Sequence, residues 1–269
     1  MSADSGSTRV GLLGVPYDGS SSYQRGAAKA PAAVRAALRH ESSNGWNESV
    51  QDVLADGVLD DFGDAAVPAS GSPLPAIEAA MRKVLDQGAR PIVLGGDHSI
   101  TYPLLRALGP RFKGLTVLHI DAHPDLYPDF EGDRFSHACP FSRVMEEGLA
   151  SRLVQVGIRT LNATQEAQAR RFGVEMITMR DWRDGWRLEA DGPVYLSFDF
   201  DGLDPAYAPG ISHPEPGGLS TRQVIGIIQG ISGTLVGADL VELNPDNDLR
   251  DLTARVGAKL VKEVVAKMR

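Results

Sequence analysis

The stretch LTVLHIDAHPD, residues 115–125, decides the fold of this chain. Its first part, Leu115–Ile120, is a short apolar run that predicts a buried strand. Its second part, Asp121–Asp125, changes abruptly to ionisable side chains. An apolar strand of this kind is typical of a parallel sheet that helices cover on both faces, and such sheets bind ligands beyond the carboxyl ends of their strands. The stretch therefore predicts an α/β fold with a polar site directly after this strand.

Short apolar runs alternate with longer segments of helical periodicity along the whole chain. Strands are predicted at Arg9–Val15, Pro91–Leu94, Leu115–Ile120, Leu153–Gly157, Val174–Ile177, Val194–Phe198 and Thr234–Val241, and helices at Ala28–Arg39, Leu74–Gln87, Tyr102–Leu108, Ala163–Phe172, Thr221–Ile231 and Leu252–Lys267. No long linker or internal repeat divides these elements, so residues 1–269 are expected to form one domain. The predicted fold class is a single-domain, three-layer α/β/α sandwich with a central parallel sheet.

The composition excludes several classes of function. The chain has 269 residues, 42 % of them hydrophobic, and a formal net charge of −8. A surface with excess negative charge does not attract nucleic acid or anionic lipid. No apolar run reaches the ~18 residues of a membrane helix, and the start MSADSGSTRV lacks the features of a signal peptide. The single cysteine, Cys139, fits a reducing compartment. We therefore expect a cytoplasmic protein without nucleic-acid or membrane partners.

Three predicted strands end in side chains of the kind that bind metal ions. These strand ends are GGDHS at 95–99, DAHPD at 121–125 and DFD at 199–201. Alternation along an extended chain places Asp121, His123 and Asp125 on one side. Asp199 and Asp201 share a side for the same reason, so both sets can point into one cleft.

Carboxylates this close together need a counter-charge to stay ionised. Four carboxylates and two imidazoles would balance two divalent cations, and an oxygen-rich set without thiolates favours Mn²⁺ over structural zinc. The candidate ligands are His98, Asp121, His123, Asp125, Asp199 and Asp201. Asp-x-Asp and Gly-Gly-Asp-His taken alone are more often a turn or a helix cap, whereas Asp-x-His-x-Asp directly after a buried strand is a metal site about as often as not. It is the presence of all three at strand ends that favours a metal site. Their order also differs from that of metallophosphatases, in which Asp-x-His comes first.

Together with the surrounding sequence, these motifs resemble the signatures of the arginase and agmatinase ureohydrolases. The matching segments include GVPYD (14–18), FEG (130–132), SHA (136–138), QVGIR (155–159), SFDFDGLDP (197–205), APGISH (208–213) and VELNP (241–245), and plant-type arginases are the most similar branch. The resemblance implies an arginase-like α/β/α sandwich with two manganese ions per subunit. One ion would be held by His98, Asp121, Asp125 and Asp199, and the other by Asp121, His123, Asp199 and Asp201, with Asp121 and Asp199 shared.

The resemblance also implies the reaction. A water activated between the two cations would attack the guanidinium carbon of the substrate and release urea and an amine. His137 matches the family's proton-shuttling histidine, and Glu242 matches the carboxylate that binds the guanidinium through paired N–H bonds. Asp125 is counted with the catalytic residues as well as with the metal ligands. The family further implies a homo-oligomer, either a trimer or a hexamer.

Two positions bear on the choice of substrate. Asp133 lies in the segment that recognises the substrate in the family, and its charge should repel the carboxylate of arginine unless Arg134 screens it. Asn162 stands where animal-type arginases place a carboxylate for the α-amino group. The overall likeness favours arginine, whereas agmatine or another guanidino acid stays open as an alternative. A non-catalytic metal-binding homologue is the alternative of a different class, although every expected ligand is present.

Overall fold

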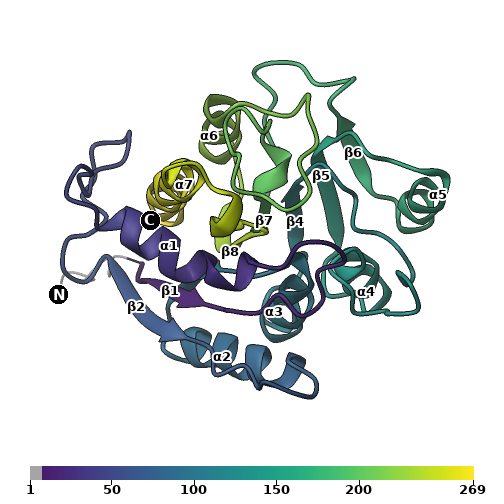
Figure 1. Cartoon of the computed structure of the whole chain (residues 1–269), viewed down its shortest axis with the longest axis horizontal. Coiled ribbons are helices and arrows are strands. Elements are labelled where there is room, and N and C mark those ends of the chain that lie inside the picture. The colour runs from purple at the N-terminus through teal and green to yellow at the C-terminus, as the bar shows by residue number, and fades with distance from the viewer. Residues whose placement is uncertain (1–7) are drawn as a thin grey trace.

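The computed structural model describes residues 8–269 and contains one eight-stranded parallel sheet with helices on both faces (Figure 1). The strand order is β2-β1-β3-β8-β7-β4-β5-β6. This arrangement confirms the predicted α/β/α sandwich. The first seven residues, on which most of the signal-peptide argument rests, lie outside the described part of the chain.

The seven strands predicted from the sequence are all present, with ends that differ by no more than one residue. The strands are β1 (Val10–Gly14), β2 (Leu59–Asp64), β3 (Arg90–Leu94), β4 (Thr116–Ile120), β5 (Arg152–Ile158), β6 (Glu175–Thr178), β7 (Pro193–Asp199) and β8 (Thr234–Val241). The eighth strand, β2, was not predicted because its sequence LDDFGD is acidic rather than apolar. It lies at the sheet edge, pairs with β1 alone, and is neutralised by Arg35, which donates to Asp61 and Asp64.

The helices form two layers on opposite faces of the sheet. They are α1 (Ala30–Leu38), α2 (Leu74–Asp86), α3 (Thr101–Leu108), α4 (Pro140–Glu146), α5 (Ala163–Phe172), α6 (Thr221–Gln229) and α7 (Leu252–Met268). In Figure 1, α1, α6 and α7 lie above the sheet, and α2, α3 and α4 lie below it. The short helix α4 was not predicted. None of the described helices is long and apolar enough to cross a membrane.

The central strands are buried on both faces, so alternate side chains enter different cores. Leu118 and Phe198 belong to the core beneath α1, α6 and α7, whereas Val117 and Tyr195 belong to the core shared with α2, α3 and α4. This alternation follows from the two-residue period of a strand. It explains why the strands appear in the sequence as continuous apolar runs.

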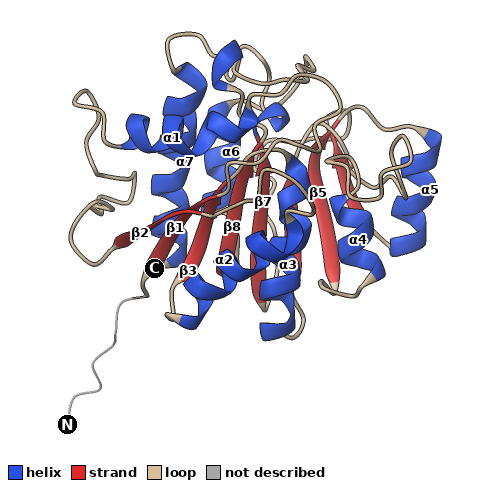
Figure 2. Ribbon diagram, turned by 60° about the horizontal axis from the view of Figure 1, so that its bottom comes forward, coloured by secondary structure: helices blue, strands red, loops and turns tan. Residues whose placement is uncertain are grey.

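Four adjacent strands, β3, β8, β7 and β4, bring their carboxyl ends to one edge of the sheet, where loops crowd together (Figure 2). The approach is closest at Gly96, where an added Cβ would lie 1.5 Å from the carbonyl oxygen of Tyr17. Only glycine fits there, and the N–H of Asp97 donates to that same carbonyl at 2.8 Å. The predicted ligand motifs follow β3, β4 and β7 and therefore meet at this edge.

Candidate metal and substrate site

His98 lies in the 3₁₀ turn His98–Ile100 that follows β3, and its side chain is fully buried. Its Nδ1 is 3.1 Å from one oxygen each of Asp121, Asp125 and Asp199. Among residues 8–269, this nitrogen has no hydrogen-bond partner of acceptable geometry. A buried nitrogen that faces three carboxylates without a hydrogen bond is suited to share a cation with them.

A buried polar chain fixes the other nitrogen of this imidazole. Nε2 of His98 lies 3.0 Å from Oγ of Ser197, whose hydroxyl donates to Asp239 at 2.7 Å. Because that proton is directed to Asp239, Ser197 accepts from the Nε2–H of His98, and the lone pair of Nδ1 faces the carboxylates. Asp239 also accepts from Tyr195 at 2.8 Å and from Thr101 at 3.1 Å. This hydrogen-bonded network was not predicted, although an aspartate inside the apolar run of β8 was a usable signal.

Asp121 directly follows β4 and is held by two neighbours. One carboxylate oxygen lies 2.7 Å from Nε2 of His119, and the other accepts from the N–H of His123 at 2.5 Å. Nε2 of Gln155 donates to the carbonyl of Pro124 at 2.6 Å and lies 3.0 Å from Nδ1 of His119. Because the amide of Gln155 donates to Nδ1 of His119, the imidazole proton is on Nε2 and faces Asp121. Neither His119 nor Gln155 was predicted to take part in the site.

His123 and Asp201 form a second group of candidate ligands beside Asp121. Nδ1 of His123 is 2.9 Å from Asp201 and 3.4 Å from Asp121. The other oxygen of Asp201 accepts from the N–H of Ala122 at 3.0 Å, and Asp199 accepts from the N–H of Asp201 at 2.7 Å. The ligand atoms of Asp121, His123 and Asp201 lie within 4.8 Å of one another. This spacing permits a cation in contact with all three.

Turns, rather than the strand alternation assumed from the sequence, bring these side chains together. β4 ends at Ile120, and Asp125 has a left-handed φ of 50°. Asp201 lies in the 3₁₀ turn Phe200–Gly202. Glu242, which follows β8, also has a left-handed φ, of 66°. Such a conformation costs a non-glycine residue on the order of 1–3 kcal/mol and is concentrated at functional sites.

The ionisable groups of this cluster have shifted pKa values. Burial, followed by repulsion from Asp121, raises the pKa of Asp201 to about 6. Burial, with repulsion from Asp201 and Asp121, raises the pKa of Asp199 as well. Burial opposes the charged form of His123, but Asp201 and Asp121 raise its pKa to about 12. Without cations the cluster therefore holds protons, which a divalent cation would displace on binding.

His137 and Glu242 meet beside the cluster. Nδ1 of His137 is 2.9 Å from Oε1 of Glu242, and its Nε2 is 2.8 Å from Oγ of Ser22. Burial opposes the charge of His137, but Glu242 raises its pKa to about 9. Oε1 of Glu242 also accepts from the N–H of His98 at 2.8 Å. Its Oε2 is buried and has no hydrogen-bond partner within residues 8–269, which leaves it available to a ligand.

A cavity of about 280 Å³ opens onto this cluster. Its lining residues are Ser22, His123, Asp125, Tyr127, Phe130, His137, Ala138, Thr160, Gln165, Asp199, Asp201, His213 and Glu242. His98 and Asp121, which are completely buried, lie behind this lining. The structure thus brings the six candidate ligands together with His137 and Glu242 at one cavity. Ser22, Tyr127 and Gln165 are lining residues that the sequence analysis did not single out.

The structure does not bring Asp133 and Asn162 to the lining of this cavity. Asp133 accepts from the N–H of Phe135 at 2.8 Å and borders a separate hollow of about 220 Å³. Arg134 pairs with Glu146 rather than with Asp133. Asn162 is the N-cap of α5. Both side chains therefore have local structural roles, and a role in substrate recognition stays a prediction.

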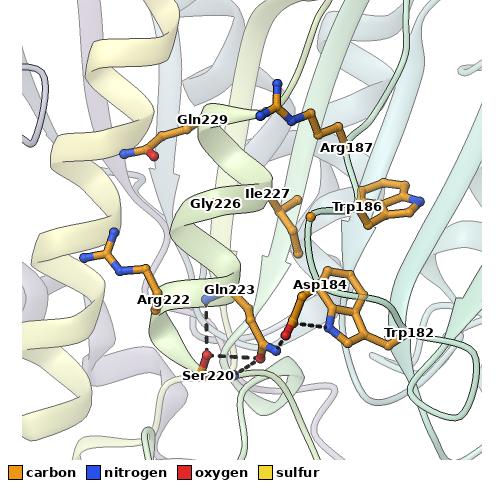
Figure 3. Close-up of a pocket in the computed structure, with 12 residues that line it drawn as sticks. Trp182, Asp184, Trp186, Arg187, Ser220, Arg222, Gln223, Gly226, Ile227 and Gln229 are labelled. Carbon is orange, nitrogen blue, oxygen red and sulfur yellow. Dashed lines mark hydrogen bonds between the residues drawn. The ribbon is translucent and has the colours of Figure 1, made fainter.

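A larger hollow, of about 580 Å³, lies between α6 and the loop that carries Trp182 and Trp186 (Figure 3). Asp184 accepts from the indole N–H of Trp182 at 3.1 Å and from Gln223 of α6 at 2.7 Å. Histidine is absent from this lining, and Asp184 is its sole carboxylate. The hollow lacks the ligand groups found at the carboxyl ends of the strands.

Comparisons with known proteins agree with this geometry. The family model described as "Arginase family" matches residues 8–266. The chain belongs to the arginase family. It is 44 % identical to arginase 1, mitochondrial, of Arabidopsis thaliana over 96 % of this chain and 80 % of that protein. It is also 37 % identical to guanidinopropionase of Pseudomonas aeruginosa, over 97 % and 87 % of the two chains. The solved arginase of Medicago truncatula superposes with a TM-score of 0.90 at 39 % identity, over 97 % and 87 % of the two chains.

Membership of the arginase family makes this chain a ureohydrolase, as the sequence motifs indicated. The arginase family is metal-dependent, and the residues present fit a metal centre. The test is the unpartnered Nδ1 of His98, which has no hydrogen bond although three carboxylates lie 3.1 Å away. A proton could satisfy only one of these contacts, whereas a cation can satisfy all of them.

Proposed function

We propose that this arginase-family protein is a binuclear manganese hydrolase that cleaves a guanidino compound to urea and an amine, with arginine as the favoured substrate. The observation that carries the proposal is the position of His98. Its Nδ1 lone pair is directed at three carboxylates by the bond between its Nε2–H and Ser197. This orientation prepares the imidazole to bind a metal before the metal arrives.

Two cation positions follow from the two groups of ligand atoms. The first would be held by His98, Asp121, Asp125 and Asp199, and the second by Asp121, His123, Asp199 and Asp201. Asp121 and Asp199 would belong to both positions. Each of the four carboxylates would then lie beside a positive charge. Oxygen-rich coordination with two imidazoles favours Mn²⁺.

A pair of divalent cations supplies a water acidified enough to act as a nucleophile at neutral pH. The protein's own residues hold the other reactants. Oε2 of Glu242 accepts N–H bonds from the guanidinium, while Oε1 is fixed by His98 and His137. The proton on Nδ1 of His137, which lies beside Oε1, is the one placed to reach the leaving nitrogen.

Arginine is favoured because relatives that are 44 % identical to this chain are named arginases. The guanidinopropionase relative is named for a substrate that also has a carboxylate. Agmatine, which lacks that carboxylate, and other guanidino acids are the alternative substrates. An inactive metal-binding homologue is the alternative that the following experiment addresses.

The test is urea release from arginine, agmatine and shorter guanidino acids, measured with and without added Mn²⁺ after chelation. We expect release that requires the metal, is fastest with arginine, and accompanies two equivalents of bound manganese per chain. Two bound equivalents without urea from any substrate would identify a non-catalytic homologue. Full activity in the chelated protein would overturn the metal proposal.

The assembly, the domain boundaries and the location are further parts of the proposal. We propose a homotrimer or homohexamer that consists of one domain per chain, to be checked by light scattering coupled to size-exclusion chromatography. We also propose a cytoplasmic location, on the ground that the single cysteine, Cys139, leaves no internal disulfide to form. The plant relatives are named as mitochondrial or chloroplastic, so fractionation of the source cells is the measurement that decides.

A further inference from the structure

The loop after β4, the loop between β5 and α5, and the first turn of α5 contribute a part of the cavity lining that carries no charge. Tyr127, Phe130, Thr160 and Gln165 make up this part. The carboxylates in the lining are Asp125, Asp199, Asp201 and Glu242, and the proposed function assigns all four to the metal ions or to the guanidinium. The uncharged part is therefore the place at which the other end of the substrate is recognised. The hydrogen-bonding capacity left on these side chains then decides which chemical group they accept.

Gln165 presents only donors to the cavity. Its side chain is 3 % exposed, and its amide oxygen accepts from the backbone N–H of Leu126 at 3.1 Å. A backbone N–H can only donate, so the atom that faces Leu126 is the oxygen and the orientation of the amide is fixed. Both N–H groups of Nε2 are then left for the cavity that Gln165 lines.

Tyr127 presents a second donor, for a related reason. The side-chain oxygen of Asn162 accepts from the backbone N–H of Gln165 at 3.1 Å, so Nδ2 is the atom that bonds the Tyr127 hydroxyl. An amide N–H can only donate, and the phenolic oxygen therefore accepts. The proton of the Tyr127 hydroxyl remains free to donate into the cavity.

Thr160 and Phe130, the other two residues of this part of the lining, add no charged acceptor. The hydroxyl of Thr160 donates to the carbonyl of Ala122 at 3.0 Å, which leaves one neutral acceptor. Phe130 is apolar and packs against Tyr127, with 5.2 Å between ring centroids. A wall with three N–H or O–H donors and no carboxylate complements an anion better than an ammonium group. The first turn of a helix, where Gln165 lies, also favours an anion.

We propose that the Tyr127 hydroxyl and the Gln165 amide donate hydrogen bonds to a carboxylate of the substrate, and that these two residues select guanidino acids over guanidino amines. This inference rests on the proposed ureohydrolase function. It assigns substrate discrimination to a residue pair that lines the cavity rather than to Asp133 and Asn162. The donors are held in place before the substrate binds, because Leu126 and Asn162 fix both side chains.

Three substrates separate the contribution of the substrate's carboxylate to kcat/KM from that of its ammonium group. Arginine has both an ammonium and a carboxylate, agmatine is arginine without the carboxylate, and 5-guanidinopentanoate is arginine without the ammonium. We expect wild-type kcat/KM for arginine and for 5-guanidinopentanoate to exceed that for agmatine by about tenfold or more, as expected for hydrogen bonds to a charged group. A preference of the wild-type protein for agmatine would overturn the inference.

Substitutions at the two residues test the assignment directly. Gln165→Glu keeps the oxygen that accepts from Leu126 but replaces the donors with a negative charge, so the ratio of arginine to agmatine should fall by about 10²-fold. The variant should fold, because Glu is favoured at the third position of a helix that an N-cap residue precedes. Gln165→Met and Tyr127→Phe each remove donors without adding charge, and each should lower the ratio by about tenfold. Thr164→Glu is the matched control, because it adds the same charge at an exposed neighbouring position and should leave the ratio unchanged.

The outcomes distinguish this inference from the proposed function. Absence of urea from every guanidino substrate would contradict the proposed function itself. Urea release with a ratio that neither Gln165→Glu nor Tyr127→Phe changes would overturn the specificity assignment and leave the ureohydrolase function standing. A fall in activity toward all three substrates by the same factor would likewise overturn it, since that result describes a structural role.

Discussion

Nδ1 of His137 lies 2.9 Å from Oε1 of Glu242, although 105 residues separate the two in the chain. The same oxygen accepts from the backbone N–H of His98 at 2.8 Å. The carboxylate of Glu242 thus connects the imidazole of His137 with the turn that carries the candidate ligand His98. Because Oε1 is occupied in this way, Oε2 is the atom that remains for a guanidinium.

His137→Asn should separate proton transfer from metal binding. The side chain contacts Glu242 and Ser22 and does not contact the six candidate ligands within hydrogen-bond distance. We expect both metal ions to stay bound and kcat to fall by about 10²–10⁴, the usual range for the loss of a general acid or base. Metal content by mass spectrometry and steady-state urea release are the measurements. Loss of a metal ion would make His137 a ligand instead.

The ion pair of His137 and Glu242 should also make the stability of the metal-free protein depend on pH. The pKa of His137 is about 9 in the fold, against 6.5 for the unperturbed imidazole. The fold therefore favours the protonated imidazole, and this stabilisation is complete below pH 6.5 and is lost as the pH rises through 9. Since each pKa unit is worth about 1.4 kcal/mol, the loss is at most about 3–4 kcal/mol.

The measurement is the free energy of unfolding in urea for the chelated wild-type protein and for chelated His137→Asn, between pH 6 and pH 10. The difference between the two proteins should shrink as the pH rises through this window. A difference that stays constant, or that grows with pH, would show that Glu242 does not retain the proton on His137.

Asp121→Ala and Asp199→Ala should each remove a carboxylate that both cation positions share. Each variant should lose at least one equivalent of manganese and nearly all activity. Asp204→Ala is a suitable control, because Asp204 accepts from the backbone of its own loop, including the N–H of Gly217 at 2.7 Å, rather than facing His98 or His123. Full metal content and activity in either bridge variant would refute the site assignment.

The layers of the fold were predictable from the sequence because the central strands are buried on both faces. Burial on both sides gives continuous apolar runs, such as LTVLHI before Asp121, and these are recognisable without tertiary information. β2 escaped prediction because an edge strand has one pairing neighbour and because Asp61 and Asp64 are neutralised by Arg35, which is 26 and 29 residues away in the chain. An ion pair between residues so far apart cannot be recognised from the sequence of the strand itself.

The candidate ligands were predictable because their three motifs lie at the carboxyl ends of recognisable strands, whereas the residues that orient them were not. Ser197 and Asp239 lie inside strands that are otherwise apolar. They bond each other across two strands, and Ser197 also bonds His98 in the turn after a third. Gln165 lines the cavity because α5 begins beside Leu126, which is a tertiary relationship. Asp133 and Asn162 were singled out by comparison with the family, but their side chains accept hydrogen bonds from backbone N–H groups two and three residues further along the chain.

Ser197→Ala should weaken metal binding without removing a ligand. The Ser197 hydroxyl accepts from Nε2–H of His98 and thereby fixes the tautomer whose Nδ1 faces the carboxylates. Without it we expect the affinity for Mn²⁺ to fall by about 10–100-fold, the usual effect of losing such a partner. Titration of the chelated protein with Mn²⁺ measures this affinity directly. Thr101→Val is the control, since Thr101 bonds the other oxygen of Asp239 and should change the affinity less. Equal losses in both variants would show a general disturbance of the buried network.

Glu242→Gln should damage substrate binding while the metal ions stay in place. The variant keeps an oxygen that can accept from His98 and His137, but it replaces Oε2 with an NH₂ group. Both that group and the guanidinium are donors, so the paired N–H bonds cannot form and a buried donor loses its acceptor. A hydrogen bond to a charged group is worth about 1.5–3 kcal/mol, so kcat/KM should fall by about 10–10²-fold, chiefly through KM. The pKa of His137 should also fall toward 6.5, because the carboxylate that raises it is gone, and the alkaline limb of the rate profile, where this proton donor is lost, should move to lower pH with it. Glu78→Gln, which neutralises a buried carboxylate of α2 that pairs with Arg82, serves as the control and should leave KM unchanged. An unchanged KM in Glu242→Gln would show that the guanidinium is bound elsewhere in the cavity, and a loss of manganese would show that Glu242 supports the metal ions rather than the substrate.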